Sequence, residues 1–188
     1  MSSESPARLH LRPPRPGDAA TLAALITPLI SSFTATWPYP YSVAMAERRI
    51  AEALAAHETR MGCYRVLTLP GGDDRMIGWL AMGLSESSLP TGTLSYWLGE
   101  AYHRKGYLTE ALPAFVTEAI AALGLKRIIA GARPNNAASI AALVRLGMHK
   151  IGEGPHYVPA RQRDEICVFY ARDIGALDDA SSAFRPSR

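Results

Sequence analysis

The chain has little of what disulfide-stabilised, metal-binding or membrane proteins need. Its two cysteines, Cys63 and Cys167, are far apart in the 188 residues, and no cysteine or histidine spacing is typical of a metal site. No apolar run is long enough to span a bilayer, and residues 1–16 lack the apolar core of a signal peptide. We therefore expect no metal and no membrane association, with the cytoplasm as the default compartment.

Charge of one sign is also scarce. The net charge is +3, and basic residues are scattered apart from Arg161, Arg163 and a turn near Arg104. A basic stripe with interleaved aromatic residues, which typifies nucleic-acid binding, is absent, so we expect no nucleic-acid partner. The mild charge suits a small anionic ligand. The apolar content of 48% suits one domain, expected over residues 8–173, with flexible termini at 1–7 and 174–188.

Hydrophobic periodicity and turn residues predict alternating strands and helices. Strands are expected at 8–12, 64–69, 76–83, 93–99, 127–132, 150–151 and 165–171. Helices are expected at 19–26, 43 to about 57, 114–123 and 137–146, with Pro28 stopping or kinking the first. Asp18 and Ser42 are expected to cap the first two, and Gly124 to end the third. Antiparallel neighbours come first and a parallel strand–helix–strand crossover follows. This order predicts a mixed α/β sheet with helices on both faces.

A basic turn containing a glycine, residues 102–111, joins a strand to a helix. The first amides of a helix have no intrahelical partners and face the positive end of the helix dipole. Arg104 and Lys105 add two charges, and Gly106 lets the backbone approach a ligand closely. The turn is therefore predicted to bind phosphate.

A second helix start, residues 133–139, follows the crossover strand. In a parallel unit both helix starts lie at the carboxyl edge of the sheet, where ligands of open α/β sheets usually bind. Asn136 and Ser139 would face the phosphate turn from there. The plainer interpretations stay open: Asn136 also fits a simple helix cap, and Ser139 a small interior residue.

At this point the sequence resembles the GNAT superfamily of acyl-CoA N-acetyltransferases, and within it the RimJ/RimL branch that acetylates ribosomal-protein alanines. The resemblance covers residues 8 to about 173 and is specific through the order and spacing of its motifs. These are residues 9–13 with 17–18, 96–98, 105–107 with 109–111, 135–140 with 146–148, and 163–164 before 168–170. It implies a seven-stranded, mostly antiparallel sheet splayed between its fourth and fifth strands.

The resemblance also implies an activity. Such a protein moves an acetyl group from acetyl-CoA to a primary amine by direct attack in a ternary complex. The pyrophosphate would lie on the amides of residues 104–109, and the pantetheine arm in the splay, at a bulge where a backbone amide polarises the thioester. Cofactor contacts would come from Trp97, Leu98, Gly99, Arg104, Lys105, Gly106, Tyr107, Leu108, Thr109, Asn136 and Ser139.

The same resemblance assigns roles near the reacting atoms. Ser139 would be the catalytic residue that protonates the leaving thiolate. Trp37 and Tyr39, from an aromatic loop, and Tyr157 would contact the acceptor. The acceptor itself is not selected: a protein N-terminus, a polyamine, an amino acid and an antibiotic all fit, and a homodimer stays open.

Five positions depart from the family pattern. His103 stands where the phosphate motif of the family has glutamine or arginine. Leu108 stands where a small residue is usual, and Pro113 either kinks the helix or forces a later start. Leu143 stands where many members have a tyrosine acid, and Thr93 where this branch often has a glutamate base. Residues Glu86, His156 and Tyr157 qualify as bases by type alone.

Two other functions stay open, the first because of the departures at Thr93 and Leu143 and the second because the same basic turn could bind ATP. One is a CoA- or acyl-CoA-binding regulatory module without transferase activity. The other is a nucleotide-binding protein, which is weaker because the G-x-x-x-x-G-K-[ST] phosphate loop is missing.

Overall fold

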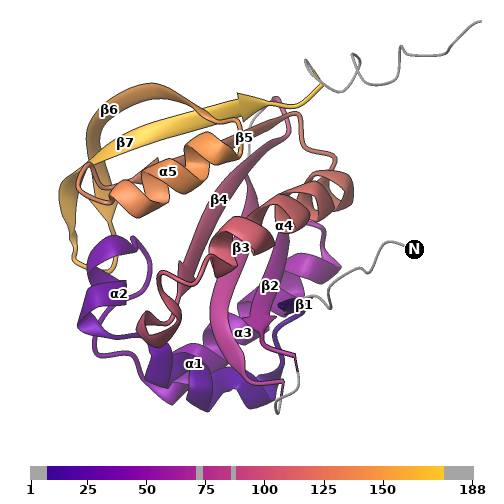
Figure 1. The fold of residues 1–188 in the computed structure, drawn as a ribbon, viewed down its shortest axis with the longest axis vertical. Helices are drawn as coiled ribbons and strands as arrows, with labels where there is room; N and C mark the ends of the chain where they lie inside the picture. The colour runs from indigo at the N-terminus through magenta and orange to yellow at the C-terminus, as the bar shows by residue number, and fades with distance from the viewer. Residues whose placement is uncertain (1–7, 71–73, 86–87, 176–188) are drawn as a thin grey trace, which may run out of the picture.

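The computed structural model describes residues 8–70, 74–85 and 88–175, which build a mixed sheet with helices on both faces (Figure 1). The expected flexible ends, 1–7 and most of 174–188, lie outside these residues. The strands are β1 (His10–Arg12), β2 (Gly62–Thr68), β3 (Met76–Ser85), β4 (Thr91–Leu98), β5 (Arg127–Ala132), β6 (His149–Val158) and β7 (Arg163–Asp173). The helices are α1 (Ala19–Leu25), α2 (Pro28–Phe33), α3 (Val43–Glu58), α4 (Tyr107–Leu123) and α5 (Ala137–Arg145), with 3-10 turns η1 (Pro16–Asp18) and η2 (Glu100–Tyr102).

The sheet confirms the predicted fold class. Its strand order is β1-β2-β3-β4-β5-β7-β6, and among the described strands only β4 and β5 pair in parallel. The crossover between them is α4, as a parallel connection requires. Seven strands, mostly antiparallel, match the expectation from the family resemblance.

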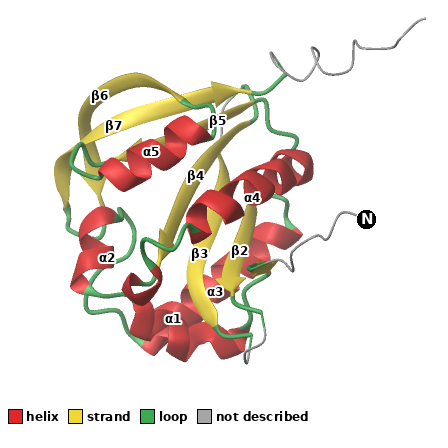
Figure 2. Cartoon of the chain, in the orientation of Figure 1, coloured by secondary structure: helices red, strands yellow, loops and turns green. Residues whose placement is uncertain are grey.

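The splay between β4 and β5 is plain in the pairing. The two strands share three residue pairs, from Thr91↔Arg127 to Thr93↔Ile129. The β3–β4 ladder continues without a register shift to Gly78↔Leu98, so the second half of β4 has a partner on one side only among the described strands (Figure 2). The expected bulge in β4 is therefore not seen in its pairing with β3, and the divergence of β5 opens the gap.

Two apolar layers hold the sheet. Leu112 and Phe115 of α4, with Leu143 of α5, fill the core on one face. On the other face Leu22 of α1 and Ile50 of α3 pack in a second cluster. Each layer buries one stripe of its helices, which is the usual reason that amphipathic helices cover a sheet.

The N-terminal helices differ from the expectation. The first helix ends at Leu25, and Pro28 then occupies the first turn of a separate helix, α2, capped by the Thr27 hydroxyl that accepts from Ile30 N at 3.3 Å. Proline is favoured at this position because its missing N–H would be unpaired there anyway. Asp18 does not cap α1 with its side chain: its carboxylate accepts from Arg15 N at 2.7 Å and from Arg12.

Helix α4 settles the open question about Pro113. The helix begins at Tyr107, immediately after Gly106, and Pro113 lies inside it, exposed. A start near Pro113 is therefore wrong. The predicted glycine at the other end is confirmed, since Gly124 has φ +62° and closes the helix.

The last hairpin is longer than the sequence pattern indicated. β6 runs over ten residues and includes Gly152, Gly154 and Pro155, which weaken a strand signal. It pairs with β7 along its length and forms the edge of the sheet.

Candidate functional site

The basic turn has an unusual backbone. Arg104 and Gly106 both take positive φ, at 61° and 79°. Glycine adopts this conformation freely, whereas an arginine there is strained, which is a feature that clusters at functional sites. Gly106 is the N-cap of α4, so the chain turns sharply there and the start of the helix faces outward.

The amides of this turn are unpaired. The first hydrogen bond of α4 is from Glu110 N to Gly106 O, at 3.2 Å. Before it, the six backbone N–H groups of Arg104 to Thr109 have no acceptor among the described residues. A run of free amides at the positive end of a 17-residue helix is an anion site, because each donor and the dipole favour negative charge.

Leu108 does not obstruct this surface. Its side chain is half-buried and packs against the main core, as does that of Tyr107. The branched side chain therefore points inward, and the Leu108 amide remains among the free donors. A large side chain at this position is therefore accommodated in the core and does not cover the amides.

At the end of β4, only one of the three residues expected to line the cofactor arm turns its backbone N–H and C=O groups toward the splay. Gly99 N donates to Ile77 O at 2.9 Å, so strand alternation turns the polar backbone groups of Trp97 and Gly99 toward β3. The backbone groups of Leu98 point the other way, into the splay. The Leu98 carbonyl lies 2.7 Å from His103 Nε2, which donates to it, and this leaves the Leu98 N–H facing the gap.

The second helix start meets β4 across the splay. Asn136 Oδ1 accepts from Ser139 N at 3.1 Å, so the expected helix cap is present. The hydroxyl of Tyr96 lies 3.0 Å from Ser139 Oγ and 3.2 Å from Ser139 O. Burial raises the pKa of the Tyr96 phenol above its ordinary value, while the hydrogen bond to Ser139 lowers it by less.

Tyr96 belongs to the motif at 96–98, and the sequence predicts no role for it. Tyr96 lies on the same face of β4 as buried Leu94 and Leu98, but no local pattern could show that this face meets Ser139, which lies 43 residues further on.

The two positions where relatives have an acid and a base carry side chains that are neither. Leu143 is fully buried in the core and offers no proton. Thr93 is exposed on β4. Three other residues qualified as bases by type. The ring of His156 lies edge-on to that of Phe169, with 5.8 Å between the ring centres, and Tyr157 is exposed. Glu86 lies outside the described residues.

The aromatic loop and the last hairpin lie together. Ala160 N donates to Ala35 O at 2.9 Å, which ties the loop carrying Tyr39 to the hairpin carrying Tyr157. Both tyrosines are more than half exposed, whereas Trp37 is 4% exposed and packs on Trp79 and Trp97. Trp37 thus supports this region from the core and offers almost no surface.

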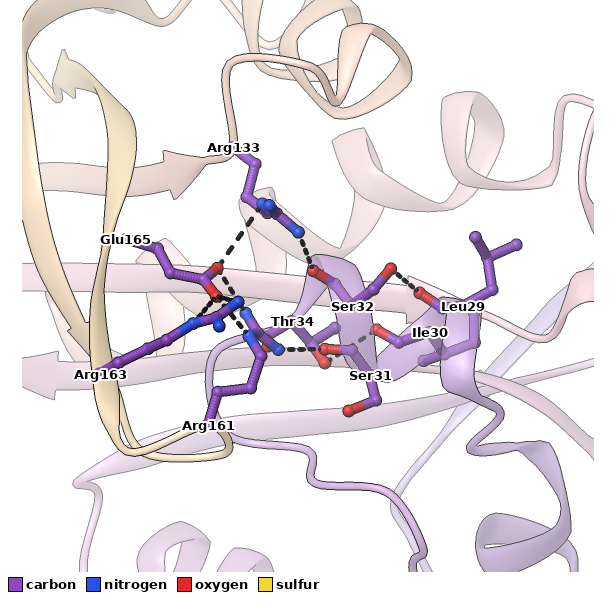
Figure 3. Close-up of polar contacts among 9 residues, drawn as sticks. All are labelled: Leu29, Ile30, Ser31, Ser32, Thr34, Arg133, Arg161, Arg163 and Glu165. Atoms are coloured by element: carbon purple, nitrogen blue, oxygen red, sulfur yellow. Dashed lines mark hydrogen bonds and ion pairs between the residues drawn. The ribbon is translucent and has the colours of Figure 1, made fainter.

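A cluster of ionic contacts holds α2 against this hairpin (Figure 3). Glu165 accepts from Arg161 at 2.8 and 3.0 Å and from Arg163 at 2.9 and 2.8 Å, and Arg133 Nε lies 3.6 Å away. The hydrogen bonds from Arg161, then those from Arg163, lower the pKa of Glu165 to about 2.

Two of these arginines also reach α2. Arg133 Nη1 donates to Ser32 O at 2.8 Å, and Arg161 Nη1 donates to Ser31 O and to Thr34 O. The carbonyls at the end of a helix carry partial negative charge, so cations bind there favourably. Glu165 is near Arg161 and Arg163 in the sequence, but the α2 carbonyls lie 101 to 130 residues from the arginines that bind them. No local pattern could therefore predict the contacts with α2.

The described residues offer neither a metal site nor a membrane span. Within 8–70, 74–85 and 88–175, no three His, Cys, Asp or Glu side chains gather as metal ligands would. No helix in this part of the chain is long and apolar enough to cross a bilayer.

Free helix-start amides lie beside a splayed β4–β5 pair, as the family resemblance implies. The model of the acetyltransferase (GNAT) domain matches residues 8–149. The chain belongs to this family.

A curated relative resembles part of this GNAT domain. The probable N-acetyltransferase YjcK of Bacillus subtilis is 38% identical over 90 residues, which are 47% of this chain and 50% of that protein. The match thus spans about half the length of this curated relative.

Solved structures share the fold at lower identity. The ribosomal-protein-S5-alanine acetyltransferase of Vibrio fischeri superposes with a TM-score of 0.79 at 19% identity, covering 94% of this chain and 98% of that one. RimJ of Mycobacterium smegmatis, solved with CoA-disulfide, gives 0.75 at 22% identity, covering 90% and 84%. These likenesses establish the GNAT fold.

Proposed function

We propose that the chain transfers an acetyl group from acetyl-CoA to a primary amine by direct attack in a ternary complex. The observation that carries the proposal is the run of unpaired amides from Arg104 to Thr109 beside the splay. The amides suit the pyrophosphate of CoA, and the half-unpaired β4 suits a pantetheine arm. RimJ of Mycobacterium smegmatis, which shares the fold, was solved with CoA-disulfide.

The acetyl thioester would lie between Leu98 and Ser139. The Leu98 N–H, which faces the splay, is the donor we assign to the developing oxyanion, in place of Trp97 or Gly99. A fixed donor stabilises the transition state more than the ground state. The leaving thiolate, with a pKa near about 8.5, needs little acid help. The Ser139 hydroxyl would stabilise it by donating a hydrogen bond while keeping its proton.

The acceptor would approach from the opposite side, past the loop and hairpin that carry Tyr39 and Tyr157. Neither Thr93 nor Leu143 supplies a strong base or acid, so we assign deprotonation of the amine to water. A protein N-terminus and a small-molecule amine both remain candidates for the acceptor.

Calorimetry with acetyl-CoA tests the first half of the proposal. Binding in the micromolar range is expected, and absence of binding at high micromolar ligand would remove acetyl-CoA as a substrate. A thiol-release screen with alanine- and serine-terminated peptides, polyamines, amino acids and amine antibiotics tests the second half.

A second candidate is a CoA-binding regulatory module. It is favoured by Leu143, which puts a buried aliphatic side chain where many relatives have an acid. Tight CoA binding without thiol release from any acceptor in the screen would select this candidate, and turnover of any acceptor would dismiss it.

A further inference from the structure

Arg8 reaches the basic turn from the start of the chain. It precedes β1 by two residues, yet its Nη2 lies 3.5 Å from Lys105 O, 97 residues further on. A Cβ built on Gly106 would lie 3.8 Å from the same nitrogen, and the guanidinium carbon lies 5.7 Å from the centre of the Tyr107 ring. The guanidinium therefore borders the unpaired amides directly.

Glu110 is the partner of Arg8. Its carboxylate accepts a hydrogen bond from Arg8 Nη2, and the two side chains are 58% and 43% exposed. Glu110 stands in the first turn of α4, where a carboxylate suits the helix dipole. The same negative charge lies beside the surface on which we place the pyrophosphate, and like charges at this range repel.

The two charges have opposite effects on an anion at this turn. The positive charge of Arg8 offsets the negative charge of Glu110. The Nε and Nη1 atoms of Arg8 have no acceptor among the described residues. An arginine presents five N–H donors in a fixed fork, so it can keep one carboxylate contact and donate to a phosphate with the others.

We propose that Arg8 is a phosphate-binding residue for CoA and that Glu110 is its counter-charge, which holds Arg8 at the turn and limits the affinity. This inference rests on the proposed function, because the anion is the phosphate group of CoA. It assigns a ligand contact to a residue outside the turn.

The proposal predicts opposite signs for two single substitutions. Arg8→Ala removes the donors and leaves Glu110 unpaired, so the Kd for CoA is expected to rise about threefold to tenfold. Glu110→Gln removes the repulsion and frees Arg8, so the Kd is expected to fall about twofold to threefold. The double substitution should lie between the wild type and Arg8→Ala.

Arg48→Ala is the matched control. Arg48 is also an exposed arginine paired with a carboxylate, Glu52, at 3.8 Å, but it lies on α3, which covers the other face of the sheet. Its removal changes the net charge equally and should leave the Kd for CoA unchanged.

Calorimetric titration of CoA and of 3′-dephospho-CoA, at low and at high salt, measures these effects. An Arg8 effect on both ligands assigns the contact to the diphosphate, and an effect on CoA alone assigns it to the 3′-phosphate. Either effect should shrink at high salt, because exposed charges are screened.

Three results separate the alternatives. If wild-type protein binds no CoA, the proposed function fails. If CoA binds and Arg8→Ala leaves both affinities unchanged, the phosphate contact is wrong. If Glu110→Gln weakens binding as much as Arg8→Ala, the pair only supports the shape of the turn, and the counter-charge role is wrong.

Discussion

The Tyr96 hydroxyl lies 3.0 Å from Ser139 Oγ and so joins β4 to the first turn of α5. The contact crosses the splay at the place where the thioester is proposed to lie. Proton transfer from Tyr96 to a thiolate would run uphill, since the raised phenol pKa exceeds that of a thiol near about 8.5. Tyr96 is therefore expected to orient Ser139 and keep its own proton.

Replacing Tyr96 by Phe should separate catalysis from binding. We expect kcat to fall about threefold to tenfold through loss of one hydrogen bond, with the Kd for acetyl-CoA unchanged. Ser139→Ala should lower kcat further. Because both residues would act as one unit, the double variant should match Ser139→Ala alone.

The pH profile provides the control for this prediction. A tyrosine that only orients Ser139 leaves the limbs of the kcat profile in place when it is replaced by Phe. Disappearance of an alkaline limb in Tyr96→Phe would instead show that Tyr96 gives up its proton, and additive losses in the double variant would contradict a shared role.

Gly106 and Gly124, at the two ends of α4, form a matched pair. Both have positive φ, 79° and 62°, and neither has a close neighbour for an added Cβ, the nearest being Arg8 Nη2 at 3.8 Å from Gly106. Replacement of either by Ala should cost about 1 kcal/mol of unfolding free energy through backbone strain. Only Gly106→Ala should also raise the Kd for CoA, because it alters the turn that carries the free amides.

Denaturant unfolding and calorimetry on the two variants check this pair. Equal losses of stability with a change in Kd for Gly106→Ala alone would support the assignment. An equal effect of Gly124→Ala on the Kd would show that general softening of α4, and not the turn, controls binding.

Local signals predicted most of the fold. The strand at 127–132 was predicted at its observed bounds, and Ser42, Asn136 and Gly124 were identified as helix boundaries, because caps and αL glycines act within a few residues. Helix α2 was missed because Pro28 reads equally well as a stop and as a first-turn residue.

The site was predicted less completely, because its contacts join distant segments. The phosphate turn and Ser139 followed from motifs, whereas Arg8 beside Lys105 and Tyr96 beside Ser139 depend on tertiary packing. The orientation of the Leu98 amide follows from the β3–β4 register, which no local pattern specifies.

Arg161 should control the order of α2. Its Nη1 binds two carbonyls in and just after that helix, Ser31 O and Thr34 O, the latter at 3.0 Å. Arg161→Ala is expected to speed amide hydrogen exchange in residues 28–36, because a short helix depends on its tertiary contacts. Arg163→Ala is the control, since Arg163 binds Glu165 and reaches no carbonyl of α2 within the described residues. Equal exchange rates in the two variants would contradict this role.

Glu165 should make stability depend on acid pH. Its folded pKa of about 2 lies below its ordinary value of 4.5, so its contribution is present above pH 4.5 and is lost as the pH falls toward 2. Glu165→Gln should lower the unfolding free energy at pH 7 by about 1–2 kcal/mol through loss of charge-assisted hydrogen bonds. The gap between variant and wild type should close between pH 4.5 and 2. Glu52→Gln, at an exposed pair with an N–O distance of 3.8 Å, is the control, with little expected change at either pH. A gap that persists to pH 2 would mean that Glu165 stabilises the hairpin through its shape and not its charge.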